Sequence, residues 1–213
     1  QGAGATWAWA GPTVQAGRKG SGRRLAREHR AGADLVIPVP DSGTGAALGL
    51  AGGSGIACDT GLVRNHYVGR PFIEPSQGIR HFGVKVKHNA VAPILAGKRV
   101  VLVDDSIVRG TTLTKLVTML RGAGAREVHV RVSSPPTIGP CYYGIDTPSK
   151  DELIASAHPV DEIRRHIEAD SLGYLSQEGL LSAVGDPEGG RHCSACFSGR
   201  YPVAAPQPEE GRF

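Results

Sequence analysis

Two adjacent carboxylates, Asp104 and Asp105, follow the apolar run 100–103 and precede a stretch of small and hydroxyl residues at 106–112. A carboxylate at the end of a buried strand needs a partner, because burial away from water disfavours its charge. Paired carboxylates can accept hydrogen bonds from sugar hydroxyls or bind a divalent cation. The following residues lead into a predicted helix N-terminus, where an anion is favoured. The pattern therefore predicts a site for a sugar that carries both a phosphate and a metal-bound group.

Strand–helix–strand units are needed to position these residues. Apolar residues 35–39 predict a buried strand, which is followed by a turn at 40–43, an Ala/Leu-rich helix and a short strand near 55–58. Residues 98–105 predict the next strand, and alternation in "EVHVRV" predicts another. Between them, Leu113, Leu116, Val117 and Leu120 have the spacing of an amphipathic helix. Repeated units of this kind imply a parallel sheet that binds ligands at the carboxyl ends of its strands.

The chain divides into four predicted segments. Residues 1–33 form a lead-in with one plausible helical turn, 34–139 the core, 140–202 a C-terminal segment of short helices, and 203–213 a disordered tail. Within the core, residues 64–89 are polar, basic and interrupted by Gly and Pro, which is typical of a loop that is either functional or disordered.

Composition favours a globular protein, with 40% hydrophobic and 21% charged residues and a net charge of +4. The basic residues are scattered and are not interleaved with aromatics, so we expect no nucleic-acid partner. No apolar run reaches the roughly 18 residues that a membrane span needs, and the N-terminus has no signal-peptide pattern. We therefore expect a cytoplasmic protein that does not bind membranes.

Cysteine spacing suggests a second centre. Cys193 and Cys196 form a C-x-x-C pair, which on its own is compatible with zinc, with an iron–sulfur cluster or with no ligand. Cys58 is predicted to be a buried thiol at a strand end, without a ligand role.

The stretch "VDDSIVRGTT" resembles the phosphoribosyl pyrophosphate (PRPP) loop of type I phosphoribosyltransferases, in the form that the amidophosphoribosyltransferases have. Neither G-x-x-x-x-G-K nor a G-x-G-x-x-G after a strand is present. The similarity extends to "ADLVIPVPDSG", "YVGRPFIEPSQGIR", "CYYGIDTPSKDELIA" and "CSACFSGRYP", and it covers roughly residues 22–202. The resemblance implies an α/β fold of the type I phosphoribosyltransferase class, a parallel sheet flanked by helices, with a C-terminal helical segment that binds a cluster.

The resemblance also assigns roles at the predicted site. Asp104 and Asp105 would bind the ribose hydroxyls and Mg²⁺, with Ser42 as the third metal-site residue. The residues that would bind PRPP through its 5-phosphate are Ser106, Ile107, Val108, Arg109, Gly110, Thr111 and Thr112.

The basic loop resembles the family's flexible loop, which closes over PRPP. Tyr67 and Lys87 would contact the substrate, and Arg70 and Lys85 would act in catalysis beside the two aspartates by neutralising pyrophosphate. The sequence departs from the family pattern here, with His66 where Arg is common and Pro71 where Thr is common.

Three cysteines match the positions of iron–sulfur ligands in the family: Cys141, Cys193 and Cys196. A [4Fe–4S] cluster takes four thiolates, and the fourth matching ligand is not present in this chain.

The implied reaction is the transfer of an amino group from ammonia to C1 of PRPP, giving 5-phosphoribosylamine and pyrophosphate, the first step of de novo purine biosynthesis. In the full family enzymes a glutaminase half with an N-terminal Cys nucleophile releases the ammonia from glutamine. Gln1 cannot be that nucleophile. We therefore expect an ammonia-dependent transferase in which residues 1–33 are the remnant of a junction to a missing glutaminase domain. The resemblance further implies a homo-oligomer and purine nucleotides as feedback inhibitors.

Two other functions remain open. The first is a non-catalytic regulator that binds PRPP, although no helix-turn-helix pattern accompanies the predicted site. The second is a salvage transferase that uses a purine or pyrimidine base, which the cysteine-containing C-terminal stretches do not favour.

Overall fold

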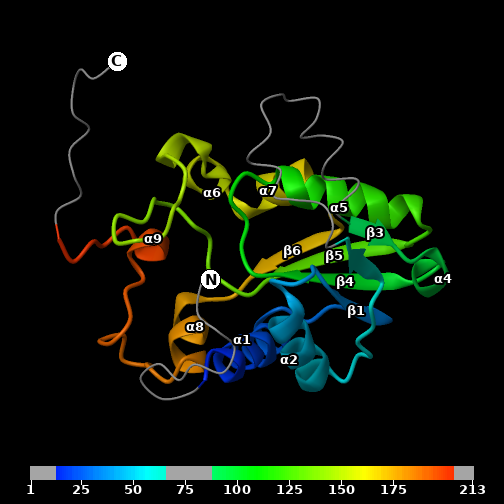
Figure 1. Cartoon of the computed structure of the whole chain (residues 1–213), viewed down its shortest axis with the longest axis horizontal. Coiled ribbons are helices and arrows are strands. Elements are labelled where there is room, and N and C mark those ends of the chain that lie inside the picture. The colour runs from blue at the N-terminus through cyan, green and yellow to red at the C-terminus, as the bar shows by residue number, and fades with distance from the viewer. Residues whose placement is uncertain (1–12, 66–87, 204–213) are drawn as a thin grey trace.

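The computed structural model describes residues 13–65 and 88–203, and within them a parallel sheet forms the centre of the fold. Its four strands follow the order β1-β4-β5-β6 (Figure 1). They are β1 (Leu35–Pro38), β4 (Arg99–Asp104), β5 (Glu127–Val132) and β6 (Ser171–Tyr174), and all three pairings are parallel. Parallel neighbours need crossover connections, and helices supply them here. The predicted α/β architecture is confirmed.

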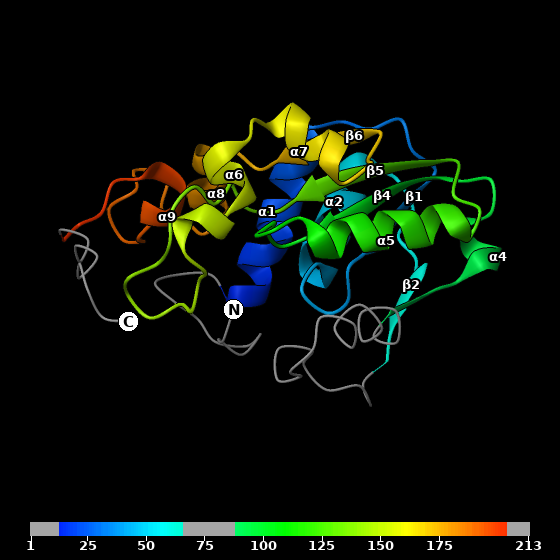
Figure 2. The ribbon, with the colours of Figure 1, turned by 90° about the horizontal axis from the view of Figure 1, so that it is seen from above.

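Helices cover both faces of the sheet (Figures 1 and 2). The longest of the helices that cover one face are α1 (Val14–Glu28) and α2 (Thr44–Ser54), and those over the other are α5 (Thr111–Gly122) and α7 (Val160–His166). Side chains of β4 alternate between the layers: Val100 and Leu102 join the cluster under α5, while Val101 and Val103 join the one under α1 and α2. Burial on both sides explains why β4 is a continuous apolar run.

Two glycines let α1 and α2 cross closely. A Cβ on Gly22 would lie 1.9 Å from the carbonyl oxygen of Ala46, and a Cβ on Gly49 would lie 2.1 Å from that of Lys19. Leu25 on α1 is fully buried against the sheet. The sequence prediction of a single helical turn in this region was wrong, because the glycines that lower helix propensity are the residues that allow this packing.

A small antiparallel sheet lies beside the main one. It pairs β2 (Leu62–Arg64) with β3 (His88–Ala90), and α4 (Ala92–Leu95) follows it. The strand predicted near residues 55–58 is a single bridge between Cys58 and Val36. Cys58 is exposed rather than buried as predicted, since it lies on the outer side of the edge strand β1.

The C-terminal part returns to the core. It contains a 3₁₀ turn at Lys150–Glu152, then α6 (Ile154–Ala157), α7, β6, α8 (Gln177–Ala183) and α9 (Ala195–Ser198). The prediction of short helices missed β6, because a four-residue strand with Gly173 lacks an apolar run. The hydroxyl and backbone N–H of Ser176, before α8, donate to the carboxylate of Glu28 on α1. The C-terminal segment is thus tied to the first helix.

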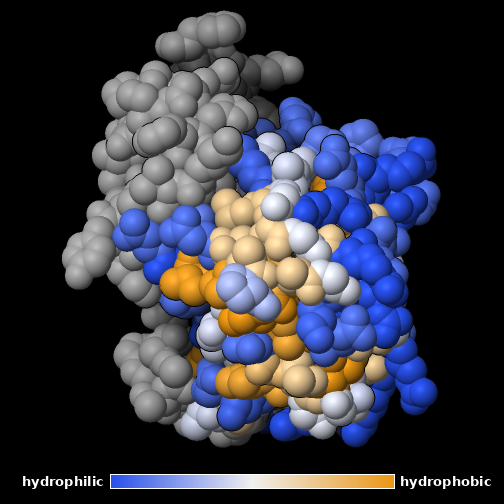
Figure 3. All heavy atoms as spheres, turned by 90° about the vertical axis from the view of Figure 1, so that its right-hand side faces the viewer, coloured by the Kyte–Doolittle hydropathy of each residue, from blue (hydrophilic) through white to orange (hydrophobic). Residues whose placement is uncertain are grey.

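Among the described helices, none is both long and apolar enough to cross a membrane. Figure 3 shows the side of the molecule at which the strands of the main sheet begin. Apolar residues lie in the middle of this surface, and hydrophilic residues lie to the right of them.

The helix crossing gives a direct test of the packing. We expect Gly22→Ala to lower the free energy of unfolding by about 3 kcal/mol, since the added methyl group meets backbone that cannot move without separating the helices. Gly52→Ala on α2 is the matched control, because nothing lies within 4 Å of its Cβ. It should be neutral or stabilising by about 0.5 kcal/mol. Urea denaturation measures both, and equal effects of the two substitutions would contradict the close crossing.

Candidate active site

The predicted metal-site residues meet at the carboxyl ends of β1 and β4. Asp104 is the last residue of β4 and is 7% exposed. Its Oδ1 accepts a hydrogen bond from the Ser42 hydroxyl at 2.9 Å and one from the Asp105 backbone N–H at 2.8 Å. Ser42 lies in the turn that follows β1, the parallel neighbour of β4. The pairing of these strands therefore brings Ser42 to Asp104, which is 62 positions away in the chain.

Burial makes the charge of Asp104 costly. Desolvation, followed by the nearby charge of Asp105, raises the pKa of Asp104 to about 7, while the hydrogen bonds from Asp105 and Ser42 act in the opposite direction. A cation beside this carboxyl group would stabilise its ionised form. The donor set of two carboxylates and a hydroxyl is the oxygen chemistry that Mg²⁺ prefers, so these residues fit the predicted ion.

The stretch after Asp105 leads into the N-terminus of α5, which no side chain caps. Ile107 is buried and anchors the stretch in the main core, whereas Thr111 and Thr112 are exposed. Gly110 takes a φ of +77° at the N-cap position, and no side chain caps the helix. The positive φ favours glycine, and a Cβ there would also lie 3.2 Å from His166 and from Ile154. An uncapped helix N-terminus with adjacent hydroxyls can bind a phosphate.

The C-terminal segment holds this loop in place. The Nε of Arg109 donates to Oε2 of Glu152 at 2.8 Å, and the backbone N–H of Ile154 donates to the Val108 carbonyl at 2.9 Å. Arg109, predicted to bind the phosphate, therefore has its charge paired within the chain. The sequence analysis missed Glu152 and Ile154, because partners that lie more than 40 residues away leave no local motif.

A second ion pair lies beside Ser42. Arg64, at the end of β2, pairs with the carboxylate of Asp41. This cation was also missed, because only the meeting of β2 with the turn after β1 brings it to the site. The predicted loop contacts Tyr67, Arg70, Lys85 and Lys87 lie outside the described residues, as do His66 and Pro71.

The three predicted cluster ligands share one region of the C-terminal segment. The backbone N–H groups of Ile138 and Gly139 donate to the carbonyl of Cys196 at 2.9 and 3.1 Å, which brings Cys141 close to the C-x-x-C pair. Burial, together with the charges of Cys141 and Cys193, raises the pKa of Cys196. Even so, no three His, Cys, Asp or Glu side chains within 13–65 and 88–203 are arranged to bind a metal ion. The structure gathers the cysteines without forming a ligand set.

A buried carboxylate shapes the turn before the C-x-x-C pair. Asp186 accepts hydrogen bonds from the backbone N–H groups of Gly190, Arg191 and His192 at 2.9–3.1 Å, and from the His192 ring. Its hydrogen bond with His192 lowers the pKa of Asp186 to about 2, with the backbone N–H groups acting in the same direction. The carboxylate therefore fixes the backbone that leads to Cys193.

Comparison with known proteins agrees with this geometry. Residues 67–136 match the family described as phosphoribosyl transferase domain. The chain is 54% identical over 196 residues to the amidophosphoribosyltransferase of Bacillus subtilis, covering 91% of this chain and 41% of the relative. It is 55% identical over 185 residues to that of Synechocystis sp., covering 87% and 37%.

Two solved structures are similar throughout the described fold. One is described as the allosteric regulatory enzyme of purine biosynthesis, with a TM-score of 0.87, 51% identity and coverage of 96% of this chain and 45% of that chain. The other is the glutamine PRPP amidotransferase from B. subtilis complexed with ADP and GMP, with a TM-score of 0.81, 54% identity and coverage of 89% and 42%.

The flanked parallel sheet, with paired acids and an open helix N-terminus at its carboxyl edge, defines a type I phosphoribosyltransferase fold. Within this class, the chain resembles the phosphoribosyltransferase half of the amidophosphoribosyltransferases, and the resemblance predicted from its motifs is confirmed. The chain spans about two fifths of the length of the curated relatives it matches.

The raised pKa of Asp104 predicts an unusual pH dependence of stability. A carboxyl group whose pKa is higher in the folded state contributes stability below its unfolded pKa, and this contribution is lost as the pH rises through the folded value. Here the window runs from pH 3.8 to about 7. Without Mg²⁺, we expect Asp104→Asn to become more stable relative to the unsubstituted chain across this window, by at most about 4 kcal/mol at pH 8. Thermal unfolding at pH 5 and pH 8 measures the change.

Asp34→Asn provides a control of opposite sign. The hydrogen bonds and charge of Arg99 hold the pKa of Asp34 below its usual range, so its carboxylate stabilises the fold at neutral pH. Its replacement should lower the melting temperature at both pH values. If both substitutions were destabilising at pH 8, burial of the Asp104 charge would not be a cost to the fold.

Proposed function

We propose that the chain transfers an amino group from ammonia to C1 of PRPP, releasing pyrophosphate and forming 5-phosphoribosylamine, the first step of de novo purine biosynthesis. The observation that carries this proposal is the meeting of Asp104, Asp105 and Ser42 beside the uncapped N-terminus of α5. Relatives that are 54% and 55% identical carry the name of this activity. The chain matches only part of the length of these relatives, so we infer the transferase activity of this chain as a proposal.

In this proposal each part of the site contacts a different part of PRPP. Asp104 and Asp105 accept hydrogen bonds from the ribose hydroxyls, and with Ser42 they hold Mg²⁺, which supplies positive charge to the leaving pyrophosphate. The 5-phosphate binds the backbone N–H groups and hydroxyls of residues 106–112, where the helix dipole favours an anion.

Catalysis then depends on position and charge. The transition state spreads positive charge over the ribose ring while negative charge leaves with pyrophosphate, so carboxylates near the ring and cations near the leaving group both stabilise it. Arg64 is a described cation close to the site, because it pairs with Asp41, the residue before Ser42. Tyr67, Arg70, Lys85 and Lys87 remain the predicted loop contacts.

Other proposed ligands and properties of this chain come from its relatives. Because the B. subtilis structure is described as complexed with ADP and GMP, we include purine nucleotides among the ligands of this chain. A homo-oligomer, glutamine as the source of ammonia, a cytoplasmic location and the boundaries at residues 34, 140 and 203 stay predictions.

We also propose that Cys141, Cys193 and Cys196 supply three thiolates to a [4Fe–4S] cluster. The donor type fits, and Cys141 and Cys193 lie close enough to Cys196 for their charges to raise its pKa, which supports the proposal. Cys58 is not among the cysteines that influence Cys196, and it lies beside β1. The fourth ligand is therefore not assigned.

Pyrophosphate release tests the transferase proposal. With PRPP, Mg²⁺ and ammonium chloride we expect turnover, and the double substitution Asp104→Asn/Asp105→Asn should reduce kcat/KM by at least about 100-fold, because the sugar and its metal lose their carboxylates. Circular dichroism of the variant controls for folding. Glutamine in place of ammonium tests the nitrogen source.

The alternatives give different results in the same assay. Tight PRPP binding without turnover under any nitrogen donor would favour a non-catalytic regulator. Pyrophosphate release that depends on an added purine or pyrimidine base would favour a salvage transferase. Absence of both binding and turnover would contradict the proposed site.

The cluster proposal has an independent readout. After anaerobic reconstitution with iron and sulfide, we expect the chain to retain iron, acid-labile sulfide and visible absorption. Cys193→Ser and Cys196→Ser should abolish all three, because serine is a poor cluster ligand. Cys58→Ser is the matched control and should keep them, and equal loss in this control would indicate adventitious binding to thiols.

A further inference from the structure

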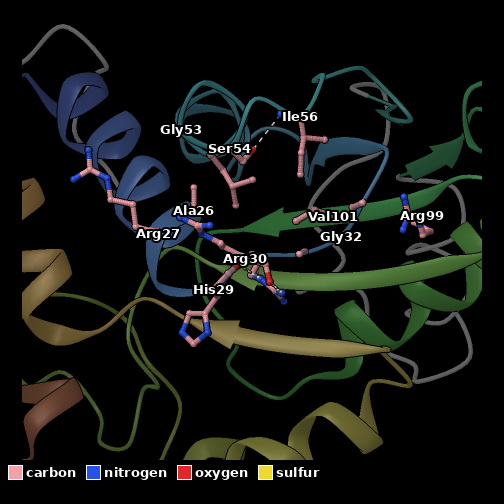
Figure 4. A pocket seen from close by; sticks show the side chains of 14 residues that line it. Ala26, Arg27, His29, Arg30, Gly32, Gly53, Ser54, Ile56, Arg99 and Val101 are labelled. Carbon is pink, nitrogen blue, oxygen red and sulfur yellow. Dashed lines mark hydrogen bonds between the residues drawn. The ribbon is translucent and has the colours of Figure 1, made fainter.

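A second pocket opens at the edge of the sheet opposite to the acids. It has a volume of about 400 Å³ and lies between the C-terminal ends of α1 and α2 and the strands (Figure 4). Ala33 precedes β1 and Arg99 begins β4, so the pocket belongs to the amino ends of the strands. Asp104 ends β4, at the carboxyl edge, and it does not line this pocket. The pocket is therefore separate from the candidate active site.

A buried guanidinium group forms part of the pocket wall. Arg131 on β5 is 4% exposed. Its Nε donates to the carbonyl of His29 at 2.9 Å, and its Nη1 donates to the carbonyl of Val130 at 2.8 Å and to the hydroxyl of Ser171 at 3.0 Å. All of these acceptors are neutral. The Nη2 group makes only a long hydrogen bond of 3.4 Å, to the carbonyl of Arg30, so one of its N–H bonds remains for another acceptor.

The charge of Arg131 has no carboxylate partner within the described part of the chain. Buried charges are normally paired, because the loss of water is not compensated by neutral groups alone. Burial lowers the pKa of Arg131 only to about 10, so the guanidinium stays charged at neutral pH. The guanidinium of Arg131 can therefore still bind an anion through its Nη2 group.

The rest of the described wall is mostly positive, small or apolar, with His29 and Ser54 as its other polar residues. Arg30 lines the pocket, is exposed and has no ion pair within the described residues, while the nearby Arg99 is paired with Asp34. Arg27 extends away from the other labelled side chains (Figure 4). Leu50, Ile56 and Val101 add apolar surface, and no Asp or Glu is among the described lining residues.

We propose that this pocket binds a small organic dianion, a phosphate monoester with a compact apolar body. Arg131 and Arg30 have no carboxylate partner among the residues that the structure describes, and their two positive charges match a dianion. Guanidinium groups also match the geometry of phosphate oxygens. The apolar part of the wall can contact an apolar group attached to the phosphate. The pocket volume falls within the range of small-ligand pockets. The proposal shares no residue with the proposed transferase site and does not depend on that function.

Residue-resolved NMR titration with phenyl phosphate tests the proposal on the chain as it stands. We expect saturable shifts at the amides of Gly32, Gly53 and Ile56. Phenyl phosphate should bind more tightly than inorganic phosphate, which lacks the apolar body, and more tightly than benzoate, which carries one charge. Shifts at residues 106–112 would report the other site separately, so failure of one site leaves the other measurable.

Arg30→Ala and Arg23→Ala form a matched pair of substitutions. Both residues are exposed and lose one positive charge, but only Arg30 lines the pocket. Arg30→Ala should weaken the binding measured at Gly32 about tenfold, whereas Arg23→Ala should leave it unchanged. Arg131→Lys keeps the positive charge but loses the Nη2 group of the guanidinium, so this substitution should also weaken phenyl phosphate binding.

Three results would overturn the proposal. Shifts confined to residues 106–112 would place the anion at the candidate active site alone. Equal weakening in both alanine variants would mean attraction by general surface charge. Benzoate binding as tightly as phenyl phosphate would rule out recognition of a dianion.

Discussion

The burial of Asp104 at the end of β4 is the constraint on which the candidate site depends. β4 lies between β1 and β5, and its side chains are covered alternately by the two helical layers. Parallel pairing with both neighbours sets the register of β4 and with it the position of its last residue. The carboxyl group that ends the strand is therefore held in one place, at the cost of a disfavoured charge. A site that needs a cation and sugar hydroxyls gains preorganised ligands from this arrangement.

The C-terminal segment contributes to the site through contacts that are not part of any binding motif. Glu152 pairs with Arg109, and the N–H of Ile154 binds the carbonyl of Val108, so the loop between β4 and α5 is braced from outside the core. The Arg109–Glu152 pair is half exposed and adds little to global stability, as exposed ion pairs generally do. Its effect is local, because it fixes the direction in which the loop approaches the helix N-terminus.

The two ends of the central strands have opposite electrostatic character. The carboxyl edge carries the buried Asp104, which has no salt bridge to another described residue, while guanidinium groups gather at the amino edge around Arg131. Asp104 accepts hydrogen bonds from neutral groups and Arg131 donates to neutral groups, which fixes the orientation of each charge but does not neutralise it. The fold thus presents a cation-seeking site and an anion-seeking pocket on opposite edges of one sheet.

Much of the core follows from local pattern. The sequence predicted β4 from the apolar run 100–103 and α5 from the helical spacing between Leu113 and Leu120. It predicted the site between them from the two acids that follow the strand. The sequence could not show that α1 is a full helix, since Gly22 weakens this helix until its backbone packs against α2. Nor could it show β6, whose four residues form a strand only because β5 offers them an edge.

The sequence by itself determined which groups are available for chemistry: two adjacent carboxylates, a run of small hydroxyl residues and three matching cysteines. The tertiary structure decided which of these groups meet and what partners they have. It placed Ser42 against Asp104, paired Arg109 with Glu152 and buried Arg131 with no carboxylate partner among residues 13–65 and 88–203. The reason is physical, because residue type is local, whereas burial and pairing depend on segments that come together only when the sheet forms.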